Sequence, residues 1–424
     1  MNLRDMQEKF MIQRCKGARD LLPQDIEVFR YIEDVFRRSC MGWGYQEVRT
    51  PTLEYLHLFT AAGTLTPNML SRVYSFLDWD GWSGERVVLR PDGTIPVARL
   101  YVENASRWGV ARLFYVTNVF VFEATGAESR ERWQCGAELI GGGQPSADVE
   151  TIALAIEVLR NLGLRDVKIQ LSHAGVLGAL LKGLRLSTGD ETRLLDRILD
   201  GDIEALQKIE SFSSSHHEFL LRILNSRGTR AALIKNLRSL PQLPENVSSA
   251  LDDFAGIAEL LDALGISYQI DVTSVRGFEY YTGVCFQFLS QGKRIGSGGR
   301  YNNLIPLLGG KNTPACGFAL YMDPLMDIVV PVKKPDSERR VIVKCEQEIP
   351  SIVKAGFKVA EALRSQGYTA ELSIFGTEVA SQVAYRWLVI VRDEPVSFVI
   401  VDKERKQEKK ADSVEGAIEI IGGI

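Results

Sequence analysis

The stretch RGFEYYTGVCFQF, Arg276–Phe288, decides the fold because it returns the chain to strands after a long helical segment. Its β-branched and aromatic residues predict a strand, and alternation places Arg276 and Tyr280 on one face and Tyr281 on the other. A buried arginine needs an anion, and two adjacent phenols enter one pocket only if a bulge re-aims one of them. The stretch therefore indicates either a polar site or an amphipathic strand with an edge arginine.

Two blocks of strands flank the helical segment. Residues 112–122 (RLFYVTNVFVF), 135–142 (CGAELIGG) and 167–171 (VKIQL) predict strands, whereas ADVETIALAIEVLRNLG predicts a helix that stops at Gly163. Residues 173–265 carry helical periodicity and no strand pattern, which indicates a helical insertion. We therefore expect the blocks on either side of it to build one sheet.

The expected domains follow from these patterns. A core comprises 1–172 and 266–330, and 173–265 is inserted into it. Residues 331–337, rich in proline and charge, predict a linker. Beyond it, 338–424 alternates strand and helix patterns, as a small α/β domain does, and the charge run KERKQEKK is expected to be a solvated turn.

The bulk composition is that of a globular protein. The chain has 424 residues, a formal charge of −4 and 45% hydrophobic residues, and it lacks the basic excess of a dedicated nucleic-acid binder. The six scattered cysteines indicate reduced thiols, and the four dispersed histidines predict no metal site. No signal peptide and no apolar run of about 18 residues is present, so we expect a cytoplasmic protein without a membrane partner.

Polar residues in the strand block outline a candidate site. Asp92 and Thr94, in the stretch PDGT, can hold an ammonium group, although the same residues also form a good turn. Gln134 and Glu138 share one face of a strand, which indicates a polar pocket floor. Arg276 could bind a carboxylate, while the acidic residues could bind an amino group, so this set suits a small zwitterion.

Six stretches resemble the histidyl-tRNA synthetase group of class II aminoacyl-tRNA synthetases. The resemblance implies an α+β fold: a mixed antiparallel sheet flanked by helices, a helical insertion and an abbreviated anticodon-binding-like C-terminal domain. The stretches are KGARDLLP (16–23), VRTPTLEYLHLF (48–59), LRPDGT (89–94), QCGAELIG (134–141), VRGFEYYTGVCF (275–286) and GSGGRYNNLI (296–305).

The resemblance also implies a histidine pocket without a cofactor. The positions that match the family's pocket motifs are Asp92, Thr94, Gln134, Glu138, Arg276, Tyr280 and Tyr281.

The nucleotide side departs from the family pattern. Family enzymes place arginines after the second motif strand and in the third motif, where this chain has Val121 and Pro324. Removing one preorganised donor costs ~2.7–4 kcal/mol of transition-state stabilisation, so losing two is expected nearly to abolish adenylation. Arg130 or Arg132 would replace one of the missing arginines only if its guanidinium lay in the same position relative to the nucleotide.

A histidine pocket beside a degenerate ATP site resembles the synthetase-like regulatory subunits of ATP phosphoribosyltransferase. That resemblance implies a non-catalytic protein that binds histidine and joins a short catalytic subunit. It would support and feedback-regulate the first step of histidine biosynthesis, as a homodimer within a hetero-oligomer, and tRNA is not expected as a partner. The alternatives are a functional or degenerate histidyl-tRNA synthetase and a synthetase-like adaptor that does not sense histidine.

Overall fold

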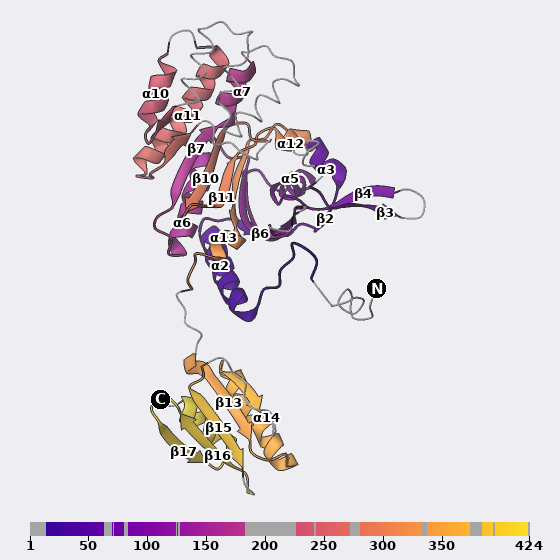
Figure 1. Cartoon of the computed structure of the whole chain (residues 1–424), viewed down its shortest axis with the longest axis vertical. Helices are drawn as coiled ribbons and strands as arrows, with labels where there is room; N and C mark the ends of the chain where they lie inside the picture. Colours follow the sequence, from indigo (N-terminus) through magenta and orange to yellow (C-terminus); the bar gives the residue numbers. More distant parts are fainter. Residues whose placement is uncertain are drawn as a thin grey trace, which may run out of the picture. The chain divides into compact units, whose positions relative to one another are not determined.

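The structure is a computed structural model of two compact units, Met1–Val330 and Pro331–Ile424, each described here by itself (Figure 1). It describes residues 14–62, 70, 72–79, 84–123, 125, 128–182, 226–240, 243–271, 280–331, 337–373, 384–392 and 395–422. Arg276 and most of the expected linker lie outside this part.

Unit 1 is built on a nine-stranded sheet whose central strands run antiparallel. Three strands from beyond the insertion lie between strands from before it, so the prediction that both blocks form one sheet is confirmed. The strands, in spatial order, are β1 (Gln46–Glu47), β5 (Ala111–Phe120), β6 (Glu131–Ile140), β12 (Ala315–Tyr321), β11 (Lys293–Arg300), β10 (Val284–Ser290), β7 (Lys168–His173), β9 (Gln269–Asp271) and β8 (Arg227–Gly228).

Two sequence expectations need correction. The strand predicted from Arg276 begins only at Val284, and the two tyrosines lie in the turn and loop before it. Strand alternation therefore does not apply to the tyrosines. The insertion, predicted to lack strands, contains the two-residue strand β8, which pairs with β9.

Helices cover both faces of this sheet. One apolar cluster joins the strands to α2 (Pro23–Gly42), α6 (Ser146–Asn161), α7 (Ala174–Lys182), α10 (Ala231–Arg238), α11 (Glu245–Ala263) and α13 (Met322–Met326). A second cluster, against the other face, includes α3 (Leu56–Ala61), α5 (Thr94–Glu103) and α12 (Leu304–Leu307). The predicted glycine stop of α6 is confirmed, since Gly163 has φ +87°. The insertion helices α10 and α11 lie beyond the β7 side of the sheet (Figure 1).

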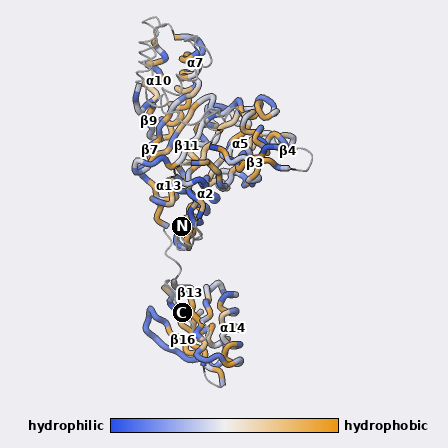
Figure 2. Tube along the Cα trace, turned by 45° about the vertical axis from the view of Figure 1, so that its right-hand side comes forward, coloured by the Kyte–Doolittle hydropathy of each residue, from blue (hydrophilic) through white to orange (hydrophobic). Residues whose placement is uncertain are grey.

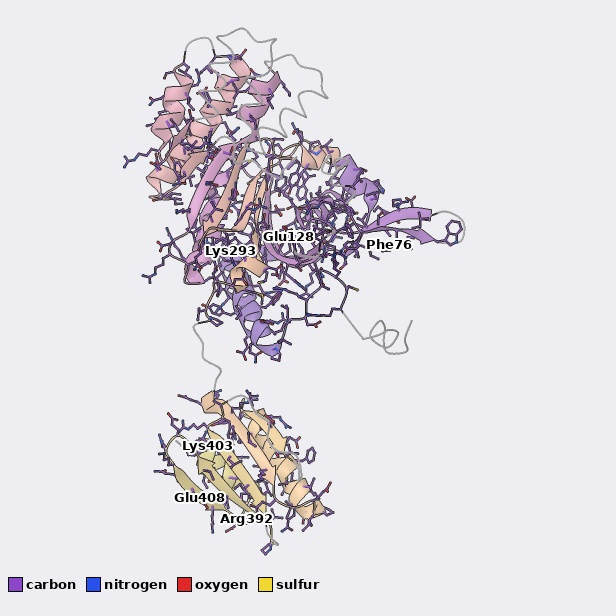
Figure 3. The ribbon with its side chains drawn as sticks, viewed as in Figure 1. Phe76, Glu128, Lys293, Arg392, Lys403 and Glu408 are labelled. Carbon is purple, nitrogen blue, oxygen red and sulfur yellow. The ribbon has the colours of Figure 1, made fainter. Side chains whose placement is uncertain are left out.

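A small second sheet of unit 1 carries exposed apolar side chains. Its strands, in order, are β2 (Leu53–Tyr55), β4 (Gly84–Leu89) and β3 (Ser75–Trp79). On β3, Phe76, Leu77 and Trp79 are 46%, 57% and 68% exposed, and Figure 3 labels Phe76 on this ribbon. Strand alternation places Leu77 and Trp79 on one face of β3 and Phe76 on the other, so the exposed pair Leu77 and Trp79 forms the apolar patch of this strand.

Unit 2 is a five-stranded sheet with its own apolar core. Its strands, in order, are β14 (Thr369–Ser373), β13 (Arg340–Cys345), β15 (Trp387–Arg392), β16 (Ser397–Asp402) and β17 (Gln407–Ala411), with α14 (Pro350–Ser365), α15 (Val414–Gly422) and the short η2 (Ser337–Arg339). Hydrophobic residues run through both units in Figure 2. The charged segment KERKQEKK, predicted to be a turn, forms a turn only over residues 403–406. Its second half, residues 407–410, belongs to strand β17.

No helix among the described residues is long and apolar enough to cross a membrane.

Candidate ligand-binding site

A small polar cavity lies where β6, β11 and β12 meet the start of α5. Its volume is about 40 Å³, which is room for about three water molecules. Five predicted site residues, Asp92, Thr94, Gln134, Tyr280 and Tyr281, line it. The other lining residues are Ser297, Tyr301, Gly317, Phe318, Ala319 and Tyr321.

Glu138, the sixth predicted residue in the described part, is buried directly behind this lining. It is 1% exposed and accepts hydrogen bonds from the hydroxyls of Tyr115, at 3.1 Å, and Tyr301. Gly317 faces it on β12, where a Cβ would lie 1.8 Å from its Oε2, so only glycine fits there. Burial raises the pKa of Glu138 to about 8, although hydrogen bonds from neighbouring hydroxyls lower it.

Asp92 and Thr94 form the rim at the N-terminus of α5. Asp92 Oδ1 accepts a hydrogen bond of 2.8 Å from the Ile95 amide, which explains the turn-like sequence of this stretch. Burial raises the pKa of Asp92, against backbone hydrogen bonds that lower it. Two carboxyl groups thus sit in or behind the cavity, and none of its described lining residues is positively charged. Such a site favours a cationic ligand.

The paired tyrosines both enter this cavity. The ring centroids of Tyr280 and Tyr281 are 5.1 Å apart, and they lie 5.8 and 6.5 Å from that of Tyr301. Both can point the same way because they precede β10 and so escape strand alternation. Burial raises the pKa of all three phenols, which therefore remain hydrogen-bond donors at neutral pH.

Two further phenols were not predicted from the sequence. Tyr115 on β5 pairs with Gly136, and a Cβ at that glycine would lie 2.2 Å from the Tyr115 ring. Because Gly136 lies between Gln134 and Glu138 on the same strand face, the glycine was a usable signal that a large group packs there. Tyr301 follows the glycine-rich stretch of β11, and no local pattern links it to Glu138, 163 residues away.

A larger cavity of about 540 Å³ adjoins the small one and shares Gln134 and Tyr321 with it. Val121 and Pro324, the two positions predicted to be degenerate, both line it, which shows that the structure brings them together. The remaining lining residues are Arg19, Pro91, Val119, Glu128, Ser129, Arg132, Trp133, Arg294, Asp323.

The arginines of this larger cavity are already engaged. Arg19 forms an ion pair with Asp323, and Arg132 lies 2.5 Å from a Glu128 carboxylate oxygen. Arg294 lies over the Tyr321 ring, 5.7 Å from its centroid. The cations here are therefore neutralised or stacked by side chains of the same cavity.

Arg130 does not line the larger cavity. Its Nε donates to the Glu123 carbonyl at 2.8 Å, and its guanidinium stacks on Phe122, 4.7 Å from the ring centroid. Of the two arginines considered as replacements, only Arg132 therefore reaches the larger cavity.

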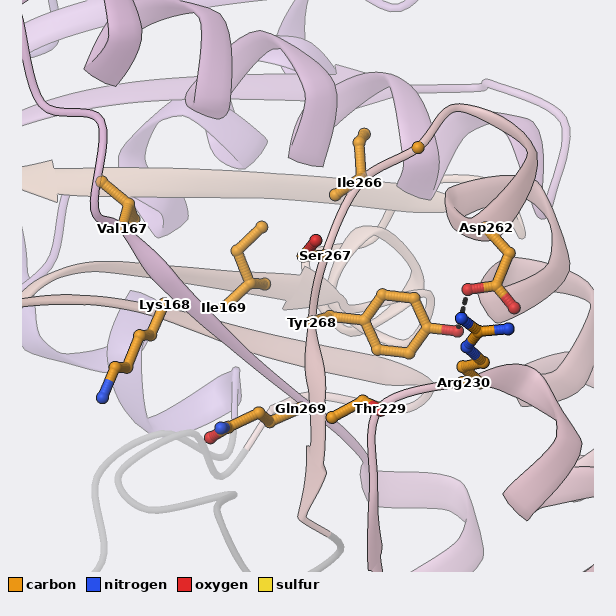
Figure 4. Close-up of a pocket in the computed structure, with 11 residues that line it drawn as sticks. Val167, Lys168, Ile169, Thr229, Arg230, Asp262, Ile266, Ser267, Tyr268 and Gln269 are labelled. Atoms are coloured by element: carbon orange, nitrogen blue, oxygen red, sulfur yellow. Dashed lines mark hydrogen bonds between the residues drawn. The ribbon is translucent and has the colours of Figure 1, made fainter.

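A third cavity, of about 630 Å³, lies between β7, β9 and the start of α10 and shares no residue with the other two (Figure 4). Tyr268 donates its hydroxyl to Asp262 there, at 2.9 Å. Within the described ranges no cluster of His, Cys, Asp and Glu is arranged to hold a metal ion.

Comparison with known proteins places these features in a family. The sequence profile of the histidyl-tRNA synthetase family matches residues 17–325. An ATP phosphoribosyltransferase regulatory subunit of Dehalococcoides mccartyi is 46% identical over 409 residues, which cover 95% of this chain and 98% of that protein. A histidine–tRNA ligase of Methanocaldococcus jannaschii is 32% identical over 88% of this chain and 89% of its own.

A solved structure agrees with these sequences. The crystal structure of an ATP phosphoribosyltransferase regulatory subunit/histidyl-tRNA synthetase from Bacillus halodurans superposes with a TM-score of 0.76 and 28% identity, covering 91% of this chain and all of that one. The class II synthetase-like α+β fold predicted from the motifs is confirmed. The chain belongs to the histidyl-tRNA synthetase family and, within it, to the ATP phosphoribosyltransferase regulatory subunits.

Proposed function

We propose that the chain is a non-catalytic regulatory subunit of ATP phosphoribosyltransferase and that its small cavity binds histidine. The observation that carries this proposal is the larger cavity, where Val121 and Pro324 occupy the two positions that would supply fixed cations. Adenylation needs such cations to neutralise the charge that develops on the reacting phosphate. Each arginine that lines the cavity already contacts another side chain there, so it would replace a missing cation only by giving up or sharing that contact.

The composition of the small cavity supports histidine as the ligand. Asp92 lines the cavity and provides a carboxyl group for the ammonium, and Thr94, Gln134, Tyr280 and Tyr281 provide further polar contacts. Glu138 lies behind this lining, bonded to Tyr115 and Tyr301, and in this proposal it contacts the imidazole once those hydroxyls move aside. In this proposal Arg276, outside the described residues, binds the carboxylate. A cavity of about 40 Å³ is smaller than an amino acid, so binding requires the cavity to widen or to open into the larger cavity with which it shares Gln134 and Tyr321.

The partners proposed are a short catalytic subunit and a second copy of this chain. Leu77 and Trp79, exposed on the same face of β3, support a homodimer, since a monomer would leave this apolar pair in water. Histidine would act by binding two states of the assembly with affinities that differ by about 1–3 kcal/mol. We also propose a cytoplasmic location for the assembly.

A histidyl-tRNA synthetase is the second candidate. The 32% identity to a histidine–tRNA ligase and the retained polar cavity favour it. The synthetase reaction requires two preorganised cations near the nucleotide. Val121 and Pro324 occupy those positions in this chain, which argues against synthetase activity.

One pair of assays separates the candidates. The purified chain is mixed with a short catalytic ATP phosphoribosyltransferase subunit, and phosphoribosyl transfer is measured with and without histidine. We expect the chain to raise the rate and histidine to lower it, while the chain alone shows no histidine-dependent ATP–pyrophosphate exchange. Robust exchange by the chain alone would reject the regulatory function in favour of the ligase.

A further inference from the structure

A buried ionic network lies on the face of β11 opposite the cavity. Arg300, the last residue of β11, is 4% exposed and bonds two carboxylates. Its Nη1 lies 2.5 Å from Asp253 Oδ2, and its Nε lies 3.2 Å from Asp148 Oδ1. Asp148 belongs to α6 and is fully buried, whereas Asp253 belongs to α11 of the insertion. The network therefore joins the insertion to the sheet.

His173, the last residue of β7, completes the network. Its Nε2 lies 2.8 Å from Asp253 Oδ2, and its Nδ1 accepts a hydrogen bond from the Val176 amide at 3.2 Å. In this geometry Nε2 donates to the Asp253 carboxylate while Nδ1 accepts from the backbone. One guanidinium thus balances two carboxylates. Burial raises the pKa of Asp148; for Asp253, hydrogen bonds from His173 and Arg300 outweigh burial and lower its pKa.

The backbone of Arg300 bonds the segment that carries Tyr280 and Tyr281, the tyrosine wall of the cavity. Its carbonyl accepts a hydrogen bond of 2.8 Å from the amide of Thr282, which directly follows Tyr280 and Tyr281. The next residue, Tyr301, bonds Glu138 from the opposite face of the strand. One residue therefore contacts the insertion through its side chain and, through its backbone, the residue that directly follows the two tyrosines.

Gly283 shows how close this packing is. A Cβ at that position would lie 2.7 Å from Arg300 Cδ, so the arginine side chain passes directly over the backbone that follows Thr282. The arginine side chain and this backbone are therefore packed with no room for a side chain between them.

We infer that Arg300 is a positioning residue that ties helix α11 of the insertion to the tyrosine wall of the cavity. A buried guanidinium cannot leave its carboxylates without creating an uncompensated charge. The position of helix α11 and the position of the tyrosine wall therefore depend on each other. Any movement of Tyr280 and Tyr281 that accompanies ligand entry is then transmitted to α11. Only the identity of the ligand in this inference rests on the proposed function.

The test compares Asp253→Ala with Asp252→Ala in the full chain. The two aspartates are neighbours on α11, and Asp252 forms an exposed ion pair of 2.7 Å with Arg238 that has no link to the cavity. Alanine favours the helix in both variants. Because Arg300 keeps Asp148 as a partner, we expect Asp253→Ala to fold, and thermal unfolding checks this.

The deciding readout is amide hydrogen exchange at Thr282 and Tyr301 in the free protein. We expect Asp253→Ala to raise both exchange rates by about 2- to 30-fold, the range for residues in a coupling network, and Asp252→Ala to leave them unchanged. Asp253→Asn retains an oxygen that accepts from Arg300 and His173, so it should return exchange towards that of the unaltered chain. Equal exchange in the two alanine variants would overturn the inference.

Histidine titration by calorimetry tests the consequence for the ligand. We expect Asp253→Ala to weaken histidine binding by a similar factor and Asp252→Ala to leave it unchanged. If the unaltered chain binds no histidine, the proposed ligand fails while hydrogen exchange still decides the role of Arg300. Should Asp253→Ala not fold, Arg300→Lys replaces it with the same criterion, because lysine cannot bridge both carboxylates as a fork.

Discussion

Glu138→Gln should remove a pH dependence of stability that the buried carboxyl group creates. Glu138 is 1% exposed, and burial raises its pKa from an ordinary value of 4.5 to about 8. Below pH 4.5 the group is protonated in the folded and the unfolded chain, and stability does not depend on it. As the pH rises from 4.5 to 8, only the unfolded chain releases the proton, so the free energy of unfolding falls.

The size of this effect follows from proton linkage. The decrease is about 1.4 kcal/mol per pH unit, which amounts to roughly 5 kcal/mol over the whole interval. Glutamine has no proton to release; its oxygen accepts from one tyrosine hydroxyl and its amide N–H donates to the other. The variant should therefore gain stability relative to the unaltered chain as pH rises. Asp92, whose pKa is also raised by burial, adds a slope to both proteins, and its charge contributes to the raised pKa of Glu138.

Urea unfolding at pH 5, 6, 7 and 8 measures this difference. Tryptophan fluorescence reports mainly on unit 1, because five of the six tryptophans precede residue 331. A cationic ligand would stabilise the ionised form of Glu138, so histidine should flatten the curve of the unaltered chain. If the difference between Glu138→Gln and the unaltered chain does not change with pH, Glu138 is not a raised-pKa group and the reasoning is refuted.

Three other predictions concern packing, assembly and domains. Gly317→Ala should lower the free energy of unfolding by about 1–3 kcal/mol, because the added Cβ would meet Glu138. Gly143→Ala is the control and should leave the free energy of unfolding unchanged, because there is open space around Gly143; urea unfolding midpoints measure both. Trp79→Asp should shift the chain from dimer to monomer in sedimentation velocity, and an unchanged sedimentation coefficient would contradict the homodimer. The fragment 1–330 should remain folded, as circular dichroism and thermal unfolding would show; aggregation would mean that unit 2 covers apolar surface.

Much of the fold could be read from local patterns. The helix that stops at Gly163, the strands β5 and β6, and the return to strands after the insertion all follow from spacing along the chain. The pairing of Gln134 and Glu138 on one face was predictable for the same reason, since side chains two and four residues apart share a face of a strand.

Contacts between distant segments were decided only by the tertiary structure. Tyr301 reaches Glu138 across 163 residues, and Arg19 pairs with Asp323 across 304. Such contacts depend on which strands lie side by side and in which register. Both are set by packing of the whole sheet, to which no local period refers.

The paired tyrosines show the same division. The sequence shows both tyrosines, and strand alternation predicts that they lie on opposite faces. In the structure β10 begins only at Val284, and both tyrosine rings line one cavity. Composition and periodicity therefore determined which groups the site contains. Where the strand begins, and hence where those groups point, was decided by hydrogen bonding between β10 and its neighbours β7 and β11, because a strand extends only as far as a partner pairs with it.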